Sequence, residues 1–319
     1  MYGMSKFALA LAVVCSILAA RAEARPVCPP AGYDRAALAG LKAQGWRIEN
    51  DATRNAFARA IVPCLGSRDP GLRDGVAYEA LYTLLRGKSL SIETMNGLYT
   101  DLMAMLQGSP GKGFAKPFAA LALSEVARAD RIEAFLTPAQ RAVLLQAAID
   151  YLTTVDDYRG FDEKEGWRHG VAHGADLMLQ LALNPALGKE DLARIRNAIG
   201  AQIAPEGHSY VFGESERLAR PVLYMAQRAQ FTEAEWTAWL AGAAAIEGDA
   251  FATAGGLARR HNLTAFFSAL YVNVKLGENT ADDALLPIHW TRRMRLDRQL
   301  RCRLNRESND CSREFTSLH

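Results

Sequence analysis

The sequence lacks the features of a membrane-embedded, fibrous or disordered protein. Its longest apolar stretch, residues 7–20, covers about 14 residues, whereas a membrane span needs about 20. Its 12 prolines and 25 glycines are ordinary usage in 319 residues, which excludes collagen-like and low-complexity chains. Charge of one sign is also scarce, because 37 basic side chains oppose 35 acidic ones. Half of the residues are hydrophobic, so we expect a chain that folds around a sizeable core.

Familiar catalytic motifs are missing as well. The chain has no phosphate-binding loop, no dinucleotide-binding glycine pattern, no serine-nucleophile elbow and no CxxC pair. Each of these motifs carries a specific chemistry. A function must therefore be sought in less familiar groupings of polar residues.

The first 24 residues are typical of a secretory signal peptide. Lys6 gives a positive start, residues 7–20 are apolar, and residues 22–24 (AEA) form a small-x-small cleavage site. We predict export to the periplasm or the medium, with the mature chain beginning near Arg25 and no membrane span after cleavage. The alternative is an uncleaved N-terminal anchor. No linker divides residues 25–319, so we expect a single domain there.

Export changes how the cysteines are interpreted. Four remain in the mature chain, and an even number in an oxidising compartment favours two disulfides. Three pairings are open. Short loops favour Cys28 with Cys64 and Cys302 with Cys311, and each bond would hold one end of the chain in place.

Residues 291–319 form a basic tail, with eight arginines against four acidic side chains. Such a tail can meet an anionic lipid surface, a polyanion or an acidic patch of the same protein. A solvated helix face is the ordinary interpretation. No aromatic side chains are interleaved with the arginines, and exported chains rarely meet nucleic acid, so we expect no nucleic-acid partner.

Apolar residues recur at i, i+3, i+4 and i+7 through most of the mature chain, which is the spacing of amphipathic helices. Capping boxes begin at Thr137 and Thr232. We predict an all-α protein whose antiparallel helix pairs form a HEAT/armadillo-like solenoid or an α/α-toroid-like array. The predicted helices cover residues 35–44, 52–65, 71–86, 92–107, 114–128, 138–155, 165–183, 189–203, 214–229, 233–246, 259–276 and 284–304.

The strongest candidate for a site lies in the glycine-rich segment 166–177. On a helix, the i, i+4, i+7 spacing of His169, His173 and Asp176 places all three side chains on one face. Three glycines form a second stripe, each costing about 1 kcal/mol in a helix. Either close packing or room for a ligand must compensate for them. We expect the long loops 156–164 and 204–213 to line the same cavity.

Three interpretations of this cluster stay open. Two histidines at i, i+4 with a carboxylate one turn later can hold a divalent metal such as zinc, although the glutamate of the H-E-x-x-H motif is missing. The same side chains can form a binding or acid/base site. The third interpretation is a buried polar knot that holds helix ends together.

Four further residues are candidates for ligand binding. Trp167 and Arg168 lie within the segment, His208 lies in the 204–213 loop, and His261 lies at the start of a strongly apolar helix. His208 and His261 are also the obvious additional nitrogen ligands for a metal. A solvated loop histidine and ordinary helix capping are their alternatives.

Three short motifs can be compared with known families. They are RGF at residues 159–161, G-W-x-H-x-x-A-H-G-x-D at 166–176, and ERLA at 216–219. Together they resemble a bacterial family, domain of unknown function family 2785, over roughly residues 71–276. The resemblance implies an all-helical body and brings no established reaction.

Two classes of function follow from these features. The first is an exported helical-repeat protein that binds a peptide, a glycan or a partner protein on its concave face near the histidines. The alternative is a hydrolase that uses a metal or a His/Asp acid–base set. The sequence leaves open which of the two the protein is.

Overall fold

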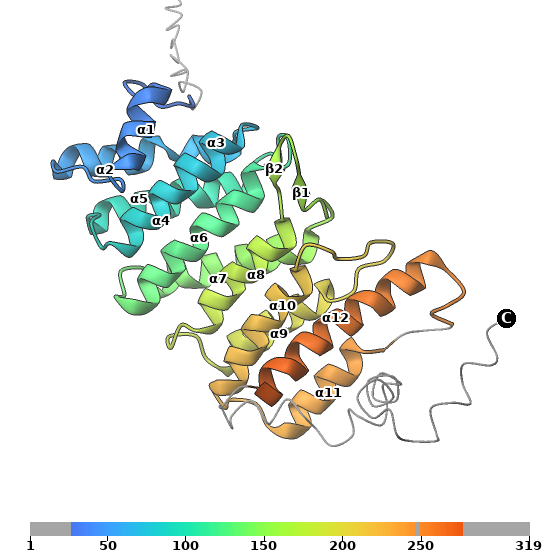
Figure 1. Ribbon diagram of the computed structural model, residues 1–319. Coiled ribbons are helices and arrows are strands. Elements are labelled where there is room, and N and C mark those ends of the chain that lie inside the picture. Colours follow the sequence, from blue (N-terminus) through green and yellow to red (C-terminus); the bar gives the residue numbers. More distant parts are fainter. Residues whose placement is uncertain (1–26, 246–248, 277–319) are drawn as a thin grey trace, which may run out of the picture.

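The computed structural model describes residues 27–245 and 249–276. This part of the chain is mostly helical (Figure 1), as the spacing of apolar residues predicts. The helices are α1 (Arg35–Ala43), α2 (Asp51–Ala60), α3 (Pro70–Leu72), α4 (Glu79–Arg86), α5 (Ile92–Gln107), α6 (Ala115–Ile132), α7 (Pro138–Thr154), α8 (Gly170–Ala182), α9 (Lys189–Gln202), α10 (Glu214–Gln227), α11 (Glu233–Ala243) and α12 (Ala254–Leu276).

Local signals in the sequence explain many of these boundaries. The capping boxes at Thr137 and Thr232 both form, with each side chain accepting a backbone N–H three residues later. Pro63 accompanies a change from α2 to a short 3-10 helix, Val62–Gly66, because proline lacks the N–H that would continue the helix. A π-helical stretch, Arg73–Tyr78, joins α3 to α4.

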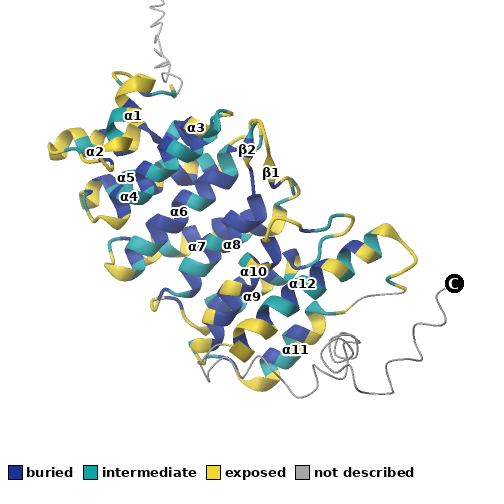
Figure 2. Ribbon diagram, viewed as in Figure 1, coloured by how far each residue is buried: buried dark blue, intermediate teal, exposed yellow. Residues whose placement is uncertain are grey.

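The helices pack in two rows along the molecule. One row runs through α4, α6, α8, α10 and α12, and the other through α2, α5, α7 and α9. From α4 to α10, consecutive helices therefore alternate between the rows. Figure 2 shows that α6 and α8, in the middle of the first row, are buried along most of their length.

Two glycines of α8 allow this close packing. A Cβ atom on Gly174 would lie 3.0 Å from Leu152 Cδ1, and one on Gly170 would lie 3.2 Å from Tyr151 Oη. Both neighbours belong to α7. The glycine stripe is thus explained at these two positions by contact between helices.

The predicted helix 165–183 is wrong at its start. Residues Phe161–Asp162 (β1) and Gly166–Trp167 (β2) form an antiparallel hairpin instead. Gly166 has φ +72° and His169 has φ +55°, and these left-handed conformations do not fit a right-handed helix. Helix α8 therefore begins only at Gly170.

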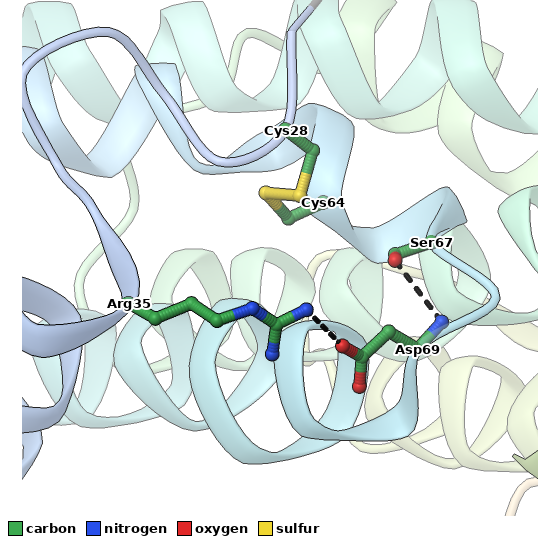
Figure 3. The surroundings of a disulfide bond; sticks show 5 residues. All are labelled: Cys28, Arg35, Cys64, Ser67 and Asp69. Atoms are coloured by element: carbon green, nitrogen blue, oxygen red, sulfur yellow. Dashed lines mark hydrogen bonds and ion pairs between the residues drawn. A yellow bond between two sulfur atoms is a disulfide. The ribbon is translucent and has the colours of Figure 1, made fainter.

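A disulfide between Cys28 and Cys64 fixes the N-terminal segment to the 3-10 helix (Figure 3). This confirms the first predicted pair. The second predicted pair, Cys302 with Cys311, lies outside the described residues. So do residues 1–24, the predicted helix 284–304 and the basic tail. Among the helices that are described, none is long and apolar enough to cross a membrane.

Candidate functional site

The β1–β2 hairpin is held against the body by Glu165. Its carboxylate accepts hydrogen bonds from Arg168 at 2.7 Å and from Arg68 at 2.7 Å, and these lower the pKa of Glu165 to about 2. Its backbone carbonyl accepts from Arg73 Nη2 at 2.7 Å. The hairpin is thereby fixed at the point where the chain enters α8.

Two buried arginines lie under the hairpin. The guanidinium groups of Arg73 and Arg168 each lie 4.2 Å from the ring centre of Phe114, a favourable cation–π distance. Burial lowers the pKa of Arg73, against the opposing charge of Asp74.

His169 sits in the left-handed conformation at the N-cap of α8. Its backbone N–H donates to the Arg159 carbonyl at 3.1 Å, and its ring stacks on Trp167 with centroids 4.7 Å apart. The ring also hydrogen-bonds to the backbone of Phe212. Its Nε2 has no hydrogen-bond partner and lies 3.7 Å from Glu214 Oε1. Burial lowers the pKa of His169, although Glu214 opposes the shift.

His173 lies in the first turn of α8, with its ring 5.7 Å from that of His169. It meets Phe118 edge-on at 5.0 Å and hydrogen-bonds to the backbone of Pro117. Its Nδ1 has no hydrogen-bond partner. Burial holds the pKa of His173 well below its usual value, so the ring is neutral at pH 7. Each histidine therefore offers one buried ring nitrogen that is unused.

Asp176 does not join the two histidines. Its carboxylate forms an ion pair with Arg217 of α10, and burial raises its pKa against the effect of that arginine. In the part of the chain that the structure describes, no group of three His, Cys, Asp or Glu side chains could hold a metal ion. The predicted metal set of His169, His173 and Asp176 therefore does not form.

His208 and His261 both contact Tyr210. The His208 ring stacks on Tyr158, with centroids 5.0 Å apart, and lies 5.8 Å from Tyr210. His261 Nε2 lies 3.1 Å from the Tyr210 carbonyl oxygen. Buried Asn262 accepts from Tyr210 N–H at 2.8 Å and donates to the His208 carbonyl at 2.8 Å. These residues fix the 204–213 loop in place.

Three aromatic side chains form an exposed cluster beside His169. Phe161, Trp167 and Phe212 are 47%, 36% and 38% exposed. The Trp167 ring lies 5.0 Å from Phe161 and 5.9 Å from Phe212. A Cβ on Gly160 would lie 2.0 Å from the Phe212 ring, so only glycine lets the 204–213 loop approach the hairpin. We call Phe161, Trp167 and Phe212 the aromatic cluster.

A groove of about 730 Å³ is lined by Val211 and Gly213, the residues on either side of Phe212. The 210–213 segment, the start of α10 and one side of α12 form its walls, and they contribute Glu214, Ser215 and His261. Ser215 Oγ is buried and has no hydrogen-bond partner. Glu214 thus lies beside His169 and also lines the groove.

Sequence reasoning missed Glu214 as a site residue. Acidic side chains at a helix N-terminus are explained by the helix dipole, and nothing in the sequence links position 214 to position 169. Two loops and one helix are needed to bring them together.

A smaller cavity of about 320 Å³ lies between the 108–113 loop and the end of α7. Its lining includes Lys116, Asp150 and Asp156. The loop at residues 108–113 therefore borders a hollow. None of the three aromatic-cluster residues lines that hollow.

The fold and the site define a class of protein: a mostly helical chain in two rows, with a hairpin and a loop that cover a pair of buried histidines. The model of a family described as protein of unknown function (DUF2785) matches residues 107–272, slightly more than half of the chain. The protein belongs to this family. The match contains α6 to most of α12, and hence both histidines, the aromatic cluster and the groove. No curated protein and no solved structure matches the chain.

Proposed function

We propose that the protein is an exported binding protein that holds its ligand at the aromatic cluster, over His169 and His173. The observation that carries this proposal is the pair of buried ring nitrogens without hydrogen-bond partners. Leaving a buried acceptor unsatisfied costs about 1–3 kcal/mol. In a purely structural polar cluster, His169 Nε2 and His173 Nδ1 would both form hydrogen bonds within the protein. In a binding site, they are available to a ligand.

The chemistry of the site favours a ligand with hydrogen-bond donors and an apolar ring face. Both histidines are neutral, because burial lowers their pKa values. An unprotonated imidazole nitrogen accepts a hydrogen bond, so the ligand supplies O–H or N–H groups. The aromatic cluster supplies flat apolar faces beside them. A glycan strand or a peptide with aromatic side chains meets both requirements.

The groove between α10 and α12 extends the proposed site. Glu214 connects the two, since it faces His169 at 3.7 Å and lines the groove. Ser215 Oγ, also unpartnered, offers a further polar contact there. We infer that a ligand held at the aromatic cluster continues into this groove, where His261 lies within reach of it.

Two further features of the proposal concern location and architecture. The signal-peptide pattern of residues 1–24 and the Cys28–Cys64 disulfide support export to the periplasm or the medium, because disulfides persist in oxidising compartments. The alternation of helices between two rows supports a HEAT/armadillo-like repeat. The two rows run from α2 and α4 at one end to α9 and α12 at the other (Figure 1), which favours a solenoid over a closed toroid.

Acid–base hydrolysis is a second candidate, favoured by the approach of His169 Nε2 to Glu214 Oε1. A neutral His169 could take a proton from water, and Glu214 could stabilise the resulting imidazolium. This candidate uses a His/Glu pair, since Asp176 is bound to Arg217. It predicts that the protein shortens the ligand that it binds.

The test is titration calorimetry of the mature protein with cellohexaose, xylohexaose, chitohexaose and a tyrosine-rich decapeptide. We expect the wild type to bind at least one of them and Trp167→Ala to bind it at least about tenfold more weakly, because stacking on an aromatic ring contributes about 1–3 kcal/mol. The control is Tyr224→Ala, which removes a similarly exposed ring (40%) near the opposite end of α10. Equal binding by Trp167→Ala and the wild type, or no binding of any probe, would contradict the proposal. Chain shortening during the titration would favour the hydrolase.

A further inference from the structure

The row formed by α4, α6, α8 and α10 carries arginines on its accessible side. Arg86 of α4, Arg128 and Arg131 of α6, and Arg217 and Arg220 of α10 are all partly or fully exposed. Helices α4 and α6 are neighbours in the row, and α8 lies between α6 and α10. We call these five side chains the arginine face.

Two carboxylates of this row form ion pairs with two of the arginines. Glu125, 5% exposed, accepts two hydrogen bonds from Arg86 at 2.8 and 2.7 Å. Asp176 forms an ion pair with Arg217. Among the described residues, Arg128, Arg131 and Arg220 have no carboxylate within ion-pair distance. With exposed Glu216, four residues before Arg220 on α10, counted as well, the five arginines outnumber the carboxylates of this face by two.

Two of the guanidinium groups are held in position before any ligand arrives. Arg86 donates to Tyr82 Oη at 2.8 Å and lies 3.9 Å above the Tyr82 ring. Arg131 donates through Nε to Gln180 Oε1 at 2.8 Å, which leaves its terminal nitrogens available for another acceptor. Fixed side chains lose less entropy when they bind. The face is thus built to receive anionic groups.

All five cations are arginine, and this favours carboxylates as the groups bound. The planar guanidinium group matches a carboxylate with two parallel hydrogen bonds, whereas lysine acts as a point charge. Packed helices lie about 8–10 Å apart, so α6 and α10, on either side of α8, are roughly 20 Å apart. At about 3.3 Å per residue, an extended peptide bridges that distance with roughly six residues. The flexible side chains of Asp and Glu can also reach arginines that are unevenly spaced.

We propose that the arginine face binds an acidic, extended peptide segment of a partner protein. Asp or Glu side chains of that segment pair with Arg128, Arg131 and Arg220. This interaction is independent of the proposed ligand at the aromatic cluster, because it uses different residues. The first ligand donates hydrogen bonds to neutral histidines, whereas the acidic peptide accepts hydrogen bonds from charged arginines. It gives the protein a second surface, for a protein partner.

The test is fluorescence anisotropy of the mature protein with a fluorescein-labelled peptide of alternating Glu and Gly. The variant is Arg128→Gln/Arg131→Gln/Arg220→Gln. The control, Arg35→Gln/Arg47→Gln/Arg194→Gln, removes the same charge from arginines that are 69%, 76% and 44% exposed elsewhere. We expect at least about tenfold weaker binding by the variant and less than about twofold by the control. The matching Gln-Gly peptide should not bind.

Two further variants and two other anionic ligands complete the test. If the triple variant fails to fold, as judged by circular dichroism, Arg128→Gln/Arg220→Gln should still weaken binding while the control does not. Replacement of the same three arginines by lysine keeps the charge but should weaken binding, because the paired hydrogen bonds are lost. Equal losses in variant and control would overturn the proposal. So would failure of the Glu-Gly peptide to bind, or tighter binding to polygalacturonate or to phosphatidylserine vesicles than to the peptide.

Discussion

Two buried polar regions of this protein differ in how completely their hydrogen bonds are made. At Asp130 every acceptor is used: Arg141 binds the carboxylate at 2.6 and 3.0 Å, and the N–H groups of Phe135 and Leu136 donate at 3.0 and 2.8 Å. Asn184 adds a bond at 3.2 Å. At the two histidines, by contrast, two ring nitrogens have no partner.

The comparison separates a structural polar knot from a candidate site. Burial alone would raise the pKa of Asp130, but Arg141 and the two backbone N–H groups hold it below its usual value. The Asp130 network therefore stabilises the folded chain. For His169 and His173, burial lowers the pKa and no charged partner reverses the shift. Their cost to stability is explained when a ligand completes the hydrogen bonds.

The largest effect is expected at the knot. Asp130→Ala removes a buried carboxylate and leaves the partly exposed Arg141 and the N–H groups of Phe135 and Leu136 without their acceptor, which should lower the free energy of unfolding by about 3–5 kcal/mol. Urea denaturation measures it. The control is Asp101→Ala, which breaks the more exposed pair with Arg59 and should cost less than about 1 kcal/mol. Similar losses in both variants would contradict the description of Asp130 as a structural knot.

The stability lost when the disulfide is removed can be compared with the stability lost at Asp130. Cys28→Ala/Cys64→Ala opens a bond that spans a separation of 36 residues, and should lower the free energy of unfolding by about 2–4 kcal/mol. The measurement is urea denaturation of the non-reduced proteins. Alkylation of the denatured, non-reduced wild type should find neither cysteine free. Detection of both as free thiols would show that the bond does not form in the exported protein.

Acid should weaken the histidine region before it affects the knot. The pKa values of both histidines are lower in the folded than in the unfolded chain, so the unfolded chain binds more protons as the pH falls below about 6.5. Stability should therefore be constant above that pH and fall below it, by up to about 1.4 kcal/mol per pH unit for each histidine.

The measurement is the urea midpoint at several pH values between 7.5 and 5. His169→Gln/His173→Leu should flatten the profile, and the difference between the two proteins cancels titrations that they share, including that of Asp176. Asp130 loses its contribution only at lower pH, as the carboxylate is protonated. An unchanged profile in the double variant would assign the acid sensitivity to other groups.

The smallest effect on stability is expected for His173→Leu. This change removes one partnered and one unpartnered nitrogen and keeps an apolar side chain against Phe118, so the free energy of unfolding should change by no more than about 1 kcal/mol. Binding of a ligand at the aromatic cluster should nevertheless be lost. Urea denaturation and calorimetry measure the two properties. A loss of several kcal/mol would place His173 among the structural knots.

The sequence predicted what local signals encode. Capping boxes fixed the starts of α7 and α11, and apolar spacing located most other helices within a few residues. It failed at residues 165–169, where the second strand of a hairpin and a left-handed turn replace the predicted start of a helix. Two left-handed residues, Gly166 and His169, and contacts with distant arginines decide that segment.

The composition of the site was only partly predictable, because it too depends on contacts between residues that are distant in the sequence. His169 and His173 do lie together, although a turn before α8 and not a continuous helix brings them there. Asp176 turned out to pair with Arg217, and Glu214 took the place beside His169. Both contacts depend on how α10 packs against α8, which no spacing along the chain encodes.

Nitrogen NMR of the histidine side chains tests the central claim most directly. In the mature protein at pH 7, we predict that His169 Nε2 and His173 Nδ1 resonate as unprotonated nitrogens without a hydrogen bond, and that the other nitrogen of each ring is protonated. Both rings should become protonated only at a lower pH than histidine in the unfolded chain, because burial lowers their pKa values. Doubly protonated rings at pH 7, the opposite tautomers, or shifts typical of hydrogen-bonded acceptors would contradict the account of this region as an open site.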